Sequence, residues 1–584
     1  MSNLVSAVRE TAHRGSDDLV SAGLGLEGLR ARPPAFANPI APTPEELRRR
    51  AIHTNWNGIV DLGPLGGFGS VYGRVANVPG REYSAFARVP GATSPHRVLA
   101  QIPDVFDLKT RCLVVAASSG SRGIYGAIAL AGAWALPRGC AIAFTDKGTG
   151  TGYFDLDSQT GATLDGTRAS RLDIDAAAFE FAPASNEGNG IAIKHAHSGD
   201  HPEADWGRHV LQAVEFGLAM LDRAFPAQAP FTSDNTRVIV AGLSNGAGAA
   251  LRAAGEDAQQ LISGIVAIAP NVHVADRGRA LFDYASEAAL LMPCALADAR
   301  FDTVPFARGG GAIPPAWLAR CARLAEQGLG EGADVAAQSR SALERLHASG
   351  WQDVAIATAA STTAFDLWRA LGAMYASAYL RRAPDAMPCG FRYSAIDAQG
   401  APIIADAAMR AAWWSDSSGI PPGAGVALLG GTDASSDPTA RGIEGLRALW
   451  TGDDGDARTL RKAVAATAAE MPRADLPMII VHGESDGLLP IAFSSSAYIA
   501  ALEAQGRDPV FWRVPHAQHF DAFLALPAFG DRYVPLMAYA YAALDRMWAH
   551  LVEHERLPAS RRFATTPRGS GPLERAALDL AAAR

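Results

Sequence analysis

The sequence has no excess of positive charge and no long apolar run. Its 584 residues include 52 Lys and Arg against 60 Asp and Glu, which gives a formal net charge of -8. This balance disfavours binding to nucleic acid or to anionic membranes, because both need a basic surface. No run of about 18 apolar residues occurs, so we expect no membrane span.

Cysteine is also scarce. The five cysteines are scattered and none has C-x-x-C spacing, so they suggest neither a zinc site nor a disulfide framework. We expect most of them to be small buried hydrophobic residues, and a single bridge stays an open alternative. These cysteines are Cys112, Cys140, Cys294, Cys321 and Cys389.

The first twenty residues lack the apolar core of a secretory signal. Charged side chains are spread through MSNLVSAVRETAHRGSDDLV. We therefore expect the chain as written to be cytoplasmic. The alternative is a secreted protein whose leader the sequence does not include.

The clearest positive feature is the run RVIVAGLSNGAGAAL, residues 237–251. Four apolar residues of strand character lead into G-L-S-N-G, and small residues with a helical pattern follow. This order is typical of a nucleophile elbow, in which glycines two positions either side of the serine leave room for the chain to reverse. Because glycine is abundant the pentapeptide alone can arise by chance, but its context makes Ser244 the candidate nucleophile.

Alternating apolar strands and helices predict an α/β-hydrolase fold. From residue 96 onward, strands such as RCLVVAASSG and AIAFTD alternate with helical segments, which is typical of a mostly parallel sheet with helices on both faces. After residue 270 helical patterns dominate, and clean strands resume only at LPMIIVHGESDG. We interpret the interruption as a large, mainly helical lid insertion.

These changes of pattern divide the chain into five parts. A threonine, a proline and a glutamate at 43–46 predict a helix start in the N-terminal part. The C-terminal tail is rich in Arg, Ala, Gly and Pro, and we expect it to be loosely held. The parts are an N-terminal segment packed on the core (1–95), the first part of the core (96–270), the lid (271–474), the second part of the core (475–558) and the tail (559–584).

A serine nucleophile needs a histidine base and an acid, and in this fold both come later in the chain. Asp486 follows an apolar strand in VHGESDG and is the candidate acid, although Ser-Asp-Gly is also a common turn sequence. The segment HAQHF offers two candidate bases, and we prefer His519, just before the closing helix, to His516 at the strand end. The upstream tract HAHSGDH has no second cluster of ligands and favours no metal site.

An oxyanion hole needs two donors where negative charge develops. The backbone amide of Asn245 is one candidate, and the loop Ser119, Gly120 and Ser121 supplies the other, although Ser and Gly also cap helices. Arg122 in the same loop is a candidate for binding a substrate carboxylate. A surface or structural salt bridge is the alternative role of this arginine.

Four motifs, SSGSRGIYGAIA, TDKGTG, AGLSNGAGAALRA and HAQHFDAF, resemble those of the D-(-)-3-hydroxybutyrate oligomer hydrolases of polyhydroxybutyrate degradation. The resemblance covers nearly the whole chain. It implies a serine esterase that cleaves soluble oligomers of (R)-3-hydroxybutyrate to monomers, with Ser244 as nucleophile and no cofactor. Two alternatives stay open: a lidded esterase for other bulky esters of feruloyl or tannin type, and a catalytically silent hydrolase-fold binding protein.

Overall fold

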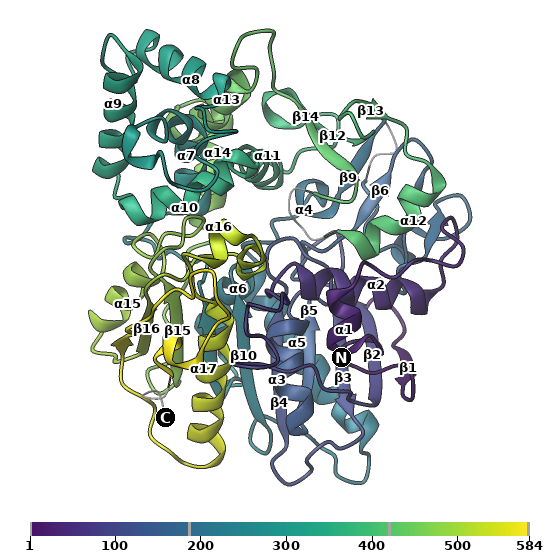
Figure 1. Cartoon of the computed structure of the whole chain (residues 1–584). Helices are drawn as coiled ribbons and strands as arrows, with labels where there is room; N and C mark the ends of the chain where they lie inside the picture. Colours follow the sequence, from purple (N-terminus) through teal and green to yellow (C-terminus); the bar gives the residue numbers. More distant parts are fainter. Residues whose placement is uncertain (1–2, 185–187, 418–421, 581–584) are drawn as a thin grey trace.

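The computed structural model describes residues 3–184, 188–417 and 422–580, and a ten-stranded sheet lies at its centre (Figure 1). Seven neighbouring strands of this sheet, in the order β5, β4, β10, β11, β15, β16 and β17, pair in parallel. The strands β1, β2 and β3 add an antiparallel edge. The predicted α/β fold with a mostly parallel sheet is therefore confirmed. In sheet order the strands are β1 (Arg9–His13), β2 (Gly80–Ala87), β3 (His96–Pro103), β5 (Ala141–Thr145), β4 (Cys112–Ala117), β10 (Arg237–Leu243), β11 (Gly264–Ile268), β15 (Met478–Gly483), β16 (Val510–Val514) and β17 (Arg561–Arg562).

The central strands are continuous apolar runs because helices cover both faces of the sheet. Alternate residues of β4 point to opposite sides: Leu113 packs in the same cluster as α5 (Trp206–Ala224) and α6 (Asn245–Glu256). Its neighbour Val114 packs in the cluster that contains α17 (Leu536–Val552). Two apolar layers of this kind account for strands that show no polar face in the sequence.

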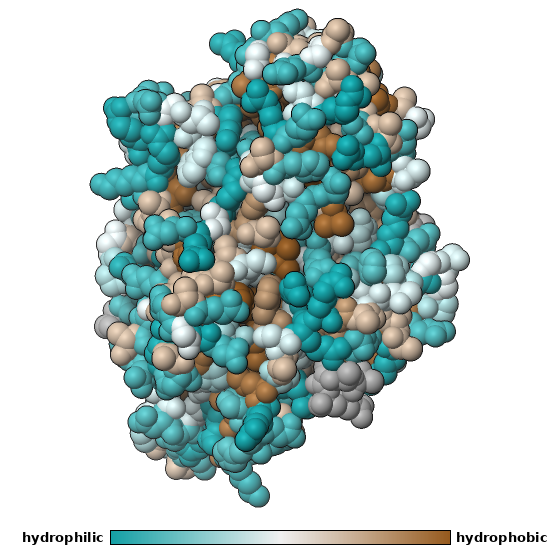
Figure 2. All heavy atoms as spheres, turned by 90° about the vertical axis from the view of Figure 1, so that its left-hand side faces the viewer, coloured by the Kyte–Doolittle hydropathy of each residue, from teal (hydrophilic) through white to brown (hydrophobic). Residues whose placement is uncertain are grey.

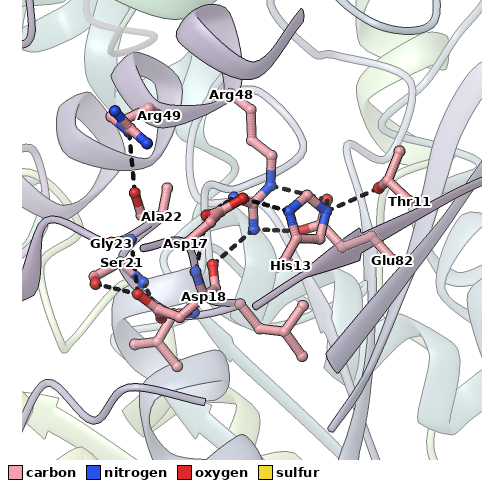
Figure 3. A network of polar contacts seen from close by, with 12 residues as sticks. Thr11, His13, Asp17, Asp18, Ser21, Ala22, Gly23, Arg48, Arg49 and Glu82 are labelled. Carbon is pink, nitrogen blue, oxygen red and sulfur yellow. Dashed lines mark hydrogen bonds and ion pairs between the residues drawn. The ribbon is translucent and has the colours of Figure 1, made fainter. Parts of the chain in front are cut away.

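A buried ion-pair network joins the N-terminal segment to the sheet (Figure 3). Arg48 of α2 (Pro44–Asn57), whose predicted start is confirmed, donates hydrogen bonds to both carboxylate oxygens of Glu82 in β2, at 3.0 and 2.8 Å, and one to Asp17 at 3.0 Å. His13 lies between the same two carboxylates. Removing one member would leave an uncompensated buried charge, so the network fixes this segment against the core.

Two excursions leave the core and lie on the same side of it, at the top of Figure 1. The first, between β5 and α5, forms a small sheet in the order β8, β7, β6, β9, and the sequence analysis missed it because each strand has only three residues. The second is the predicted insertion, residues 271–474, here called the cap. The small sheet consists of β6 (Tyr153–Asp155), β7 (Thr160–Ala162), β8 (Arg168–Ser170) and β9 (Ile191–Ile193).

The described part of the cap is mainly helical, as predicted, and it also holds a three-stranded antiparallel sheet in the order β13, β12, β14. Its helices pack around α7, which contacts α9, α11 and α13. The cap elements are α7 (Leu281–Ala295), α8 (Pro315–Glu326), α9 (Val335–Ala348), α10 (Asp353–Ala364), α11 (Leu367–Tyr379), β12 (Phe391–Ile396), β13 (Pro402–Ile403), α12 (Ala407–Asp416), β14 (Val426–Gly430), α13 (Ala440–Thr451) and α14 (Gly455–Ala465).

The cysteines differ from the prediction. Cys112 is bonded to Cys140, Cys294 is bonded to Cys321, and Cys389 is free. The expectation of mostly unpaired cysteines was wrong because the partners meet through tertiary packing: β4 lies beside β5, and α7 packs on α8. Sequence spacing carries no sign of either contact.

The C-terminal tail is held, contrary to the prediction. Its strand β17 pairs in parallel with β16, and the side chains of Phe563 and Leu578 are buried in the core. Arg561 forms an ion pair with Asp579 at 2.6 Å. Phe563, Leu573 and Leu578 are three isolated apolar side chains that anchor the segment, and composition averaged over the tail hides them.

The surface shown in Figure 2 is mainly hydrophilic, and hydrophobic side chains appear as smaller patches between hydrophilic areas. Within the described ranges no helix combines the length and the apolar character needed to cross a bilayer.

Candidate active site

Ser244 lies at the sharp turn between β10 and α6. Its φ of 61° and ψ of -125° are unusual for a residue with a side chain, and they mark the strained turn that an elbow requires. A Cβ on Gly242 would lie 2.3 Å from the backbone of Gly246, and one on Gly246 would lie 2.4 Å from the carbonyl of Ala117. Both glycines are therefore required by close backbone contacts, which explains the G-x-S-x-G pattern.

Three residues that are far apart in the sequence form one hydrogen-bonded chain behind this turn. Ser244 Oγ lies 3.0 Å from His519 Nε2, and His519 Nδ1 lies 2.7 Å from Asp486 Oδ2. All three are buried, with exposed fractions of 8%, 7% and 1%. Because a carboxylate can only accept, Nδ1–H donates to Asp486 and leaves Nε2 free to accept the serine proton.

Asp486 has both of the roles that its sequence suggested. Its Oδ1 accepts the backbone amides of Leu488 at 2.9 Å and Leu489 at 2.7 Å, which forms the turn, while Oδ2 accepts from His519. Burial alone raises the pKa of this carboxyl, but the charges and hydrogen bonds of His519 and His482 outweigh it and lower the pKa below its ordinary value. Asp486 is therefore ionised at neutral pH.

The second histidine of the HAQHF segment lies elsewhere. His516 is exposed, and its Nδ1 is 2.9 Å from the hydroxyl of Thr565 in the tail. The structure thus brings His519, and not His516, to Ser244.

The predicted oxyanion loop lies against the same pocket as the nucleophile. Ser119, Gly120 and Asn245 line the pocket together with Ser244, and Asn245 is the first residue of α6. Lys147 supports the loop from behind, since its ammonium donates to the Gly120 carbonyl at 2.5 Å. Full burial lowers the pKa of Lys147 to about 7.

The fourth predicted loop residue, Ser121, does not line this pocket but belongs to a second hydrogen-bonded chain. Its hydroxyl lies 2.6 Å from His195 Nδ1, and His195 Nε2 is hydrogen-bonded to Glu203. Burial raises the pKa of Glu203, but the neighbouring His195 lowers it below the ordinary value of a glutamate. The sequence analysis missed this chain, because no spacing rule links Ser121 to a histidine and an acid so far along the sequence.

The tract HAHSGDH, which contains His195, forms no metal site in the structure. His201 Nε2 is bonded to the carbonyl of Ala463 at 2.8 Å, and His195 is bonded to Ser121 and Glu203. Among the residues that the structure describes, no group of three or more His, Cys, Asp or Glu is placed to hold a metal ion.

Helix α11 of the cap contacts both sides of the predicted oxyanion hole. Asn245 Nδ2 donates to the hydroxyl of Tyr375 at 2.9 Å, and the Tyr375 ring lies edge-on to His195 with centroids 4.9 Å apart. Met374 Sδ accepts a hydrogen bond from Ser121 Oγ at 3.6 Å. The cap therefore contributes directly to the environment of the nucleophile.

The rest of the pocket wall is apolar except for one cation. Arg122 is buried, and its Nη2 donates to the carbonyl of Gly58 at 2.8 Å, while its Nη1 is buried without a partner. No acid of the described residues lies within ion-pair distance of this arginine, and burial lowers its pKa to about 10. The salt bridge considered as its alternative role is thus not found. The apolar wall consists of Ile59, Leu243, Leu281, Leu367, Leu371, Leu488, Leu489 and Phe520.

The family model and the relatives similar to this chain carry the same description. The model of a family described as 3HB-oligomer hydrolase (3HBOH) matches residues 2–583. A D-(-)-3-hydroxybutyrate oligomer hydrolase of Paracidovorax citrulli is 38% identical, over 97% of this chain and 89% of the relative. A protein of the same description from Cupriavidus metallidurans is 37% identical, over 96% of this chain and 85% of the relative.

Solved structures resemble the chain more distantly. Feruloyl esterase B from Aspergillus oryzae has a TM-score of 0.37 and 12% identity, over 83% of this chain and 82% of the esterase. Tannin acyl hydrolase from Aspergillus niger also has a TM-score of 0.37, with 11% identity over 83% and 81% of the two chains. Likeness at this level says nothing about the substrate.

Proposed function

The chain belongs to the 3HB-oligomer hydrolase family, and from this premise we propose that Ser244, His519 and Asp486 carry out its hydrolysis of D-(-)-3-hydroxybutyrate oligomers. The observation that carries the assignment is the continuous hydrogen-bonded chain from the Ser244 hydroxyl through His519 to the Asp486 carboxylate. A serine hydroxyl is a weak nucleophile at neutral pH, and such a chain is the means of activating it.

In the first half of the reaction Ser244 Oγ attacks an ester carbonyl carbon while His519 Nε2 accepts the serine proton. Asp486 holds the imidazole in the required tautomer and stabilises its charged form. The tetrahedral intermediate collapses when His519 gives the proton to the departing 3-hydroxyl oxygen. The acyl group then stays on Ser244, and the rest of the oligomer leaves.

In the second half water replaces the leaving hydroxyl. His519 accepts a proton from the water as it attacks the acyl-enzyme, and it returns that proton to Ser244 Oγ. The reaction needs only the protein's own groups and water.

The negative charge on the carbonyl oxygen is stabilised by the backbone amide of Asn245 and by the loop of Ser119 and Gly120. The geometry that supports this role is the common pocket wall that these three residues form with Ser244. Ser121 acts from the next position, where its bond to His195 fixes the loop. Support from Lys147 on the other side keeps the Gly120 carbonyl turned away from the charge.

Product analysis with purified protein tests the function. We expect the dimer and trimer of 3-hydroxybutyrate to yield monomer, and Ser244→Ala to lower turnover by several orders of magnitude while the fold is unchanged. A fluorophosphonate should label the native protein and not the variant. Ordinary activity in Ser244→Ala would contradict the assignment, and hydrolysis of feruloyl or galloyl esters with none of the oligomers would favour the alternative esterase.

A further inference from the structure

One buried cation in the active-site pocket has no counter-ion among the residues that the structure describes. Arg122 is 4% exposed, and its guanidinium makes one hydrogen bond, to the carbonyl of Gly58. Its Nη1 is buried and unpartnered, and no carboxylate of the described residues forms an ion pair with it. A buried charge left in this state is costly, and such groups are normally paired.

The pocket that this cation lines is otherwise apolar. Leu367 and Leu371 from the cap and Leu488 from the core form its walls, with Ser244 at its base. A wall of leucines fits the methyl and methylene groups of a hydroxybutyrate chain, but it offers nothing to an anion. Arg122 is the group in the wall that an anion can bind, and the planar guanidinium matches a carboxylate better than any other side chain does.

On the basis of the proposed function, we propose that Arg122 binds the terminal carboxylate of the oligomer, so that the enzyme cleaves from the carboxyl end of its substrate. Each oligomer carries one carboxylate, at one end only. Fixing that end in the pocket places an ester near the end of the chain at Ser244, instead of an ester chosen at random along it.

This orientation decides the length of the fragment that leaves first. The carboxyl-terminal unit is attached through its 3-hydroxyl oxygen, so it lies on the alcohol side of the last ester. When Ser244 Oγ bonds to the carbonyl carbon and the ester C–O bond breaks, the carboxylate-bearing fragment takes the proton from His519 and departs. The acyl-enzyme therefore carries the hydroxyl end of the oligomer.

Blocking one end of the substrate at a time tests the proposal. The trimer is supplied as the free acid, as its methyl ester and as its O-acetyl derivative at the hydroxyl end. For the native protein we expect kcat/KM for the free acid to exceed that for the methyl ester by roughly 10- to 100-fold, the value of a charge-assisted hydrogen bond, with the O-acetyl form close to the free acid. Arg122→Gln should bring the ratio of free acid to methyl ester close to one.

Arg168→Gln is the matched control. Arg168 is half-buried, and its Nε is buried without a partner. It donates to the backbone carbonyl of Tyr153 at 3.0 Å, and burial lowers its pKa to about 9, but it lies in β8 away from the pocket. We expect this variant to keep the native ratio. Equal losses on both substrates in Arg122→Gln, or no preference for the free acid in the native protein, would overturn the proposal.

Two further measurements apply if Arg122→Gln does not fold. A Cβ on Gly58 would lie 2.1 Å from Arg122 Nη1, and the backbone of Gly58, with φ of -82°, accepts alanine. Gly58→Ala should therefore displace the guanidinium and lower the ratio of kcat/KM for the free acid to that for the methyl ester. In the native protein, the 3-hydroxybutyrate anion should inhibit cleavage of a neutral chromogenic ester at least tenfold more strongly than methyl 3-hydroxybutyrate does. Equal inhibition would contradict the proposal, whereas cleavage of the chromogenic ester with no cleavage of any trimer would contradict the proposed function instead.

Discussion

Replacing Asp486 by asparagine should separate its two roles. Oδ1 of asparagine still accepts the amides of Leu488 and Leu489, so the turn keeps both hydrogen bonds, each worth about 1 kcal/mol. The side-chain NH₂ then faces His519 Nδ1, which has to accept instead of donate. The proton of the imidazole moves to Nε2, where it points at Ser244, and the histidine can no longer act as a base.

The expected loss follows from that tautomer. A wrong tautomer in a serine triad lowers kcat by about 10⁴-fold, or about 5.4 kcal/mol of transition-state stabilisation. We expect a loss of this size for Asp486→Asn on a soluble neutral ester, a parallel loss in the rate of fluorophosphonate labelling, and a thermal midpoint close to that of the native protein.

Asp521→Asn is a suitable control for this experiment. Asp521 is also a buried carboxyl that accepts two backbone amides, from Leu536 at 2.9 Å and Met537 at 2.8 Å, and it makes no bond to the triad. We expect this variant to keep activity. Turnover of Asp486→Asn within about tenfold of native, or a loss explained by unfolding, would show that Asp486 does not act through the tautomer of His519.

Two further outcomes can be measured. Burial raises the pKa of Asp521 from 3.8 to about 7, so the folded state holds a proton that the unfolded state releases, and native stability falls as pH rises from about 4 to about 7. Asp521→Asn lacks that titration, so its unfolding midpoint should rise relative to the native midpoint as pH rises through this range. A difference between the two midpoints that stays constant with pH would show that Asp521 is ionised in the folded state. Glu203→Gln should lower kcat roughly tenfold with KM for a neutral ester unchanged, because His195 loses the carboxylate that orients it toward Ser121 and the oxyanion loop. A lower melting temperature at native kcat would instead assign Glu203 a purely structural role.

The elements that the sequence predicts well are those that depend on local pattern. Apolar strands alternating with helices identify the fold, and two glycines at fixed spacing around Ser244 mark positions where a Cβ would lie within 2.4 Å of neighbouring backbone. Chain order in this fold is enough to nominate Asp486 and His519, which the structure places in one hydrogen-bonded chain with Ser244. Each of these signals lies within a short segment or in the order of segments.

The features that the sequence does not reveal depend on contacts between distant segments. Cys294 meets Cys321 only because α7 packs on α8, and His195 reaches Ser121 only because the excursion after β5 folds back over the core. Whether Arg122 has a counter-ion depends on all the segments that pack around it. A sequence can list charged residues, but it cannot show that no acid of the described residues forms an ion pair with this arginine.

Helix α11 contributes to the wall of the pocket and also contacts Asn245 and the predicted oxyanion loop. Its Leu367 and Leu371 line the pocket, while Tyr375 bonds to Asn245 and Met374 contacts Ser121. A movement that lifted this helix to admit an oligomer would break those two contacts at the same time. Enclosure of the pocket and the side-chain contacts to Asn245 and Ser121 thus depend on the same helix.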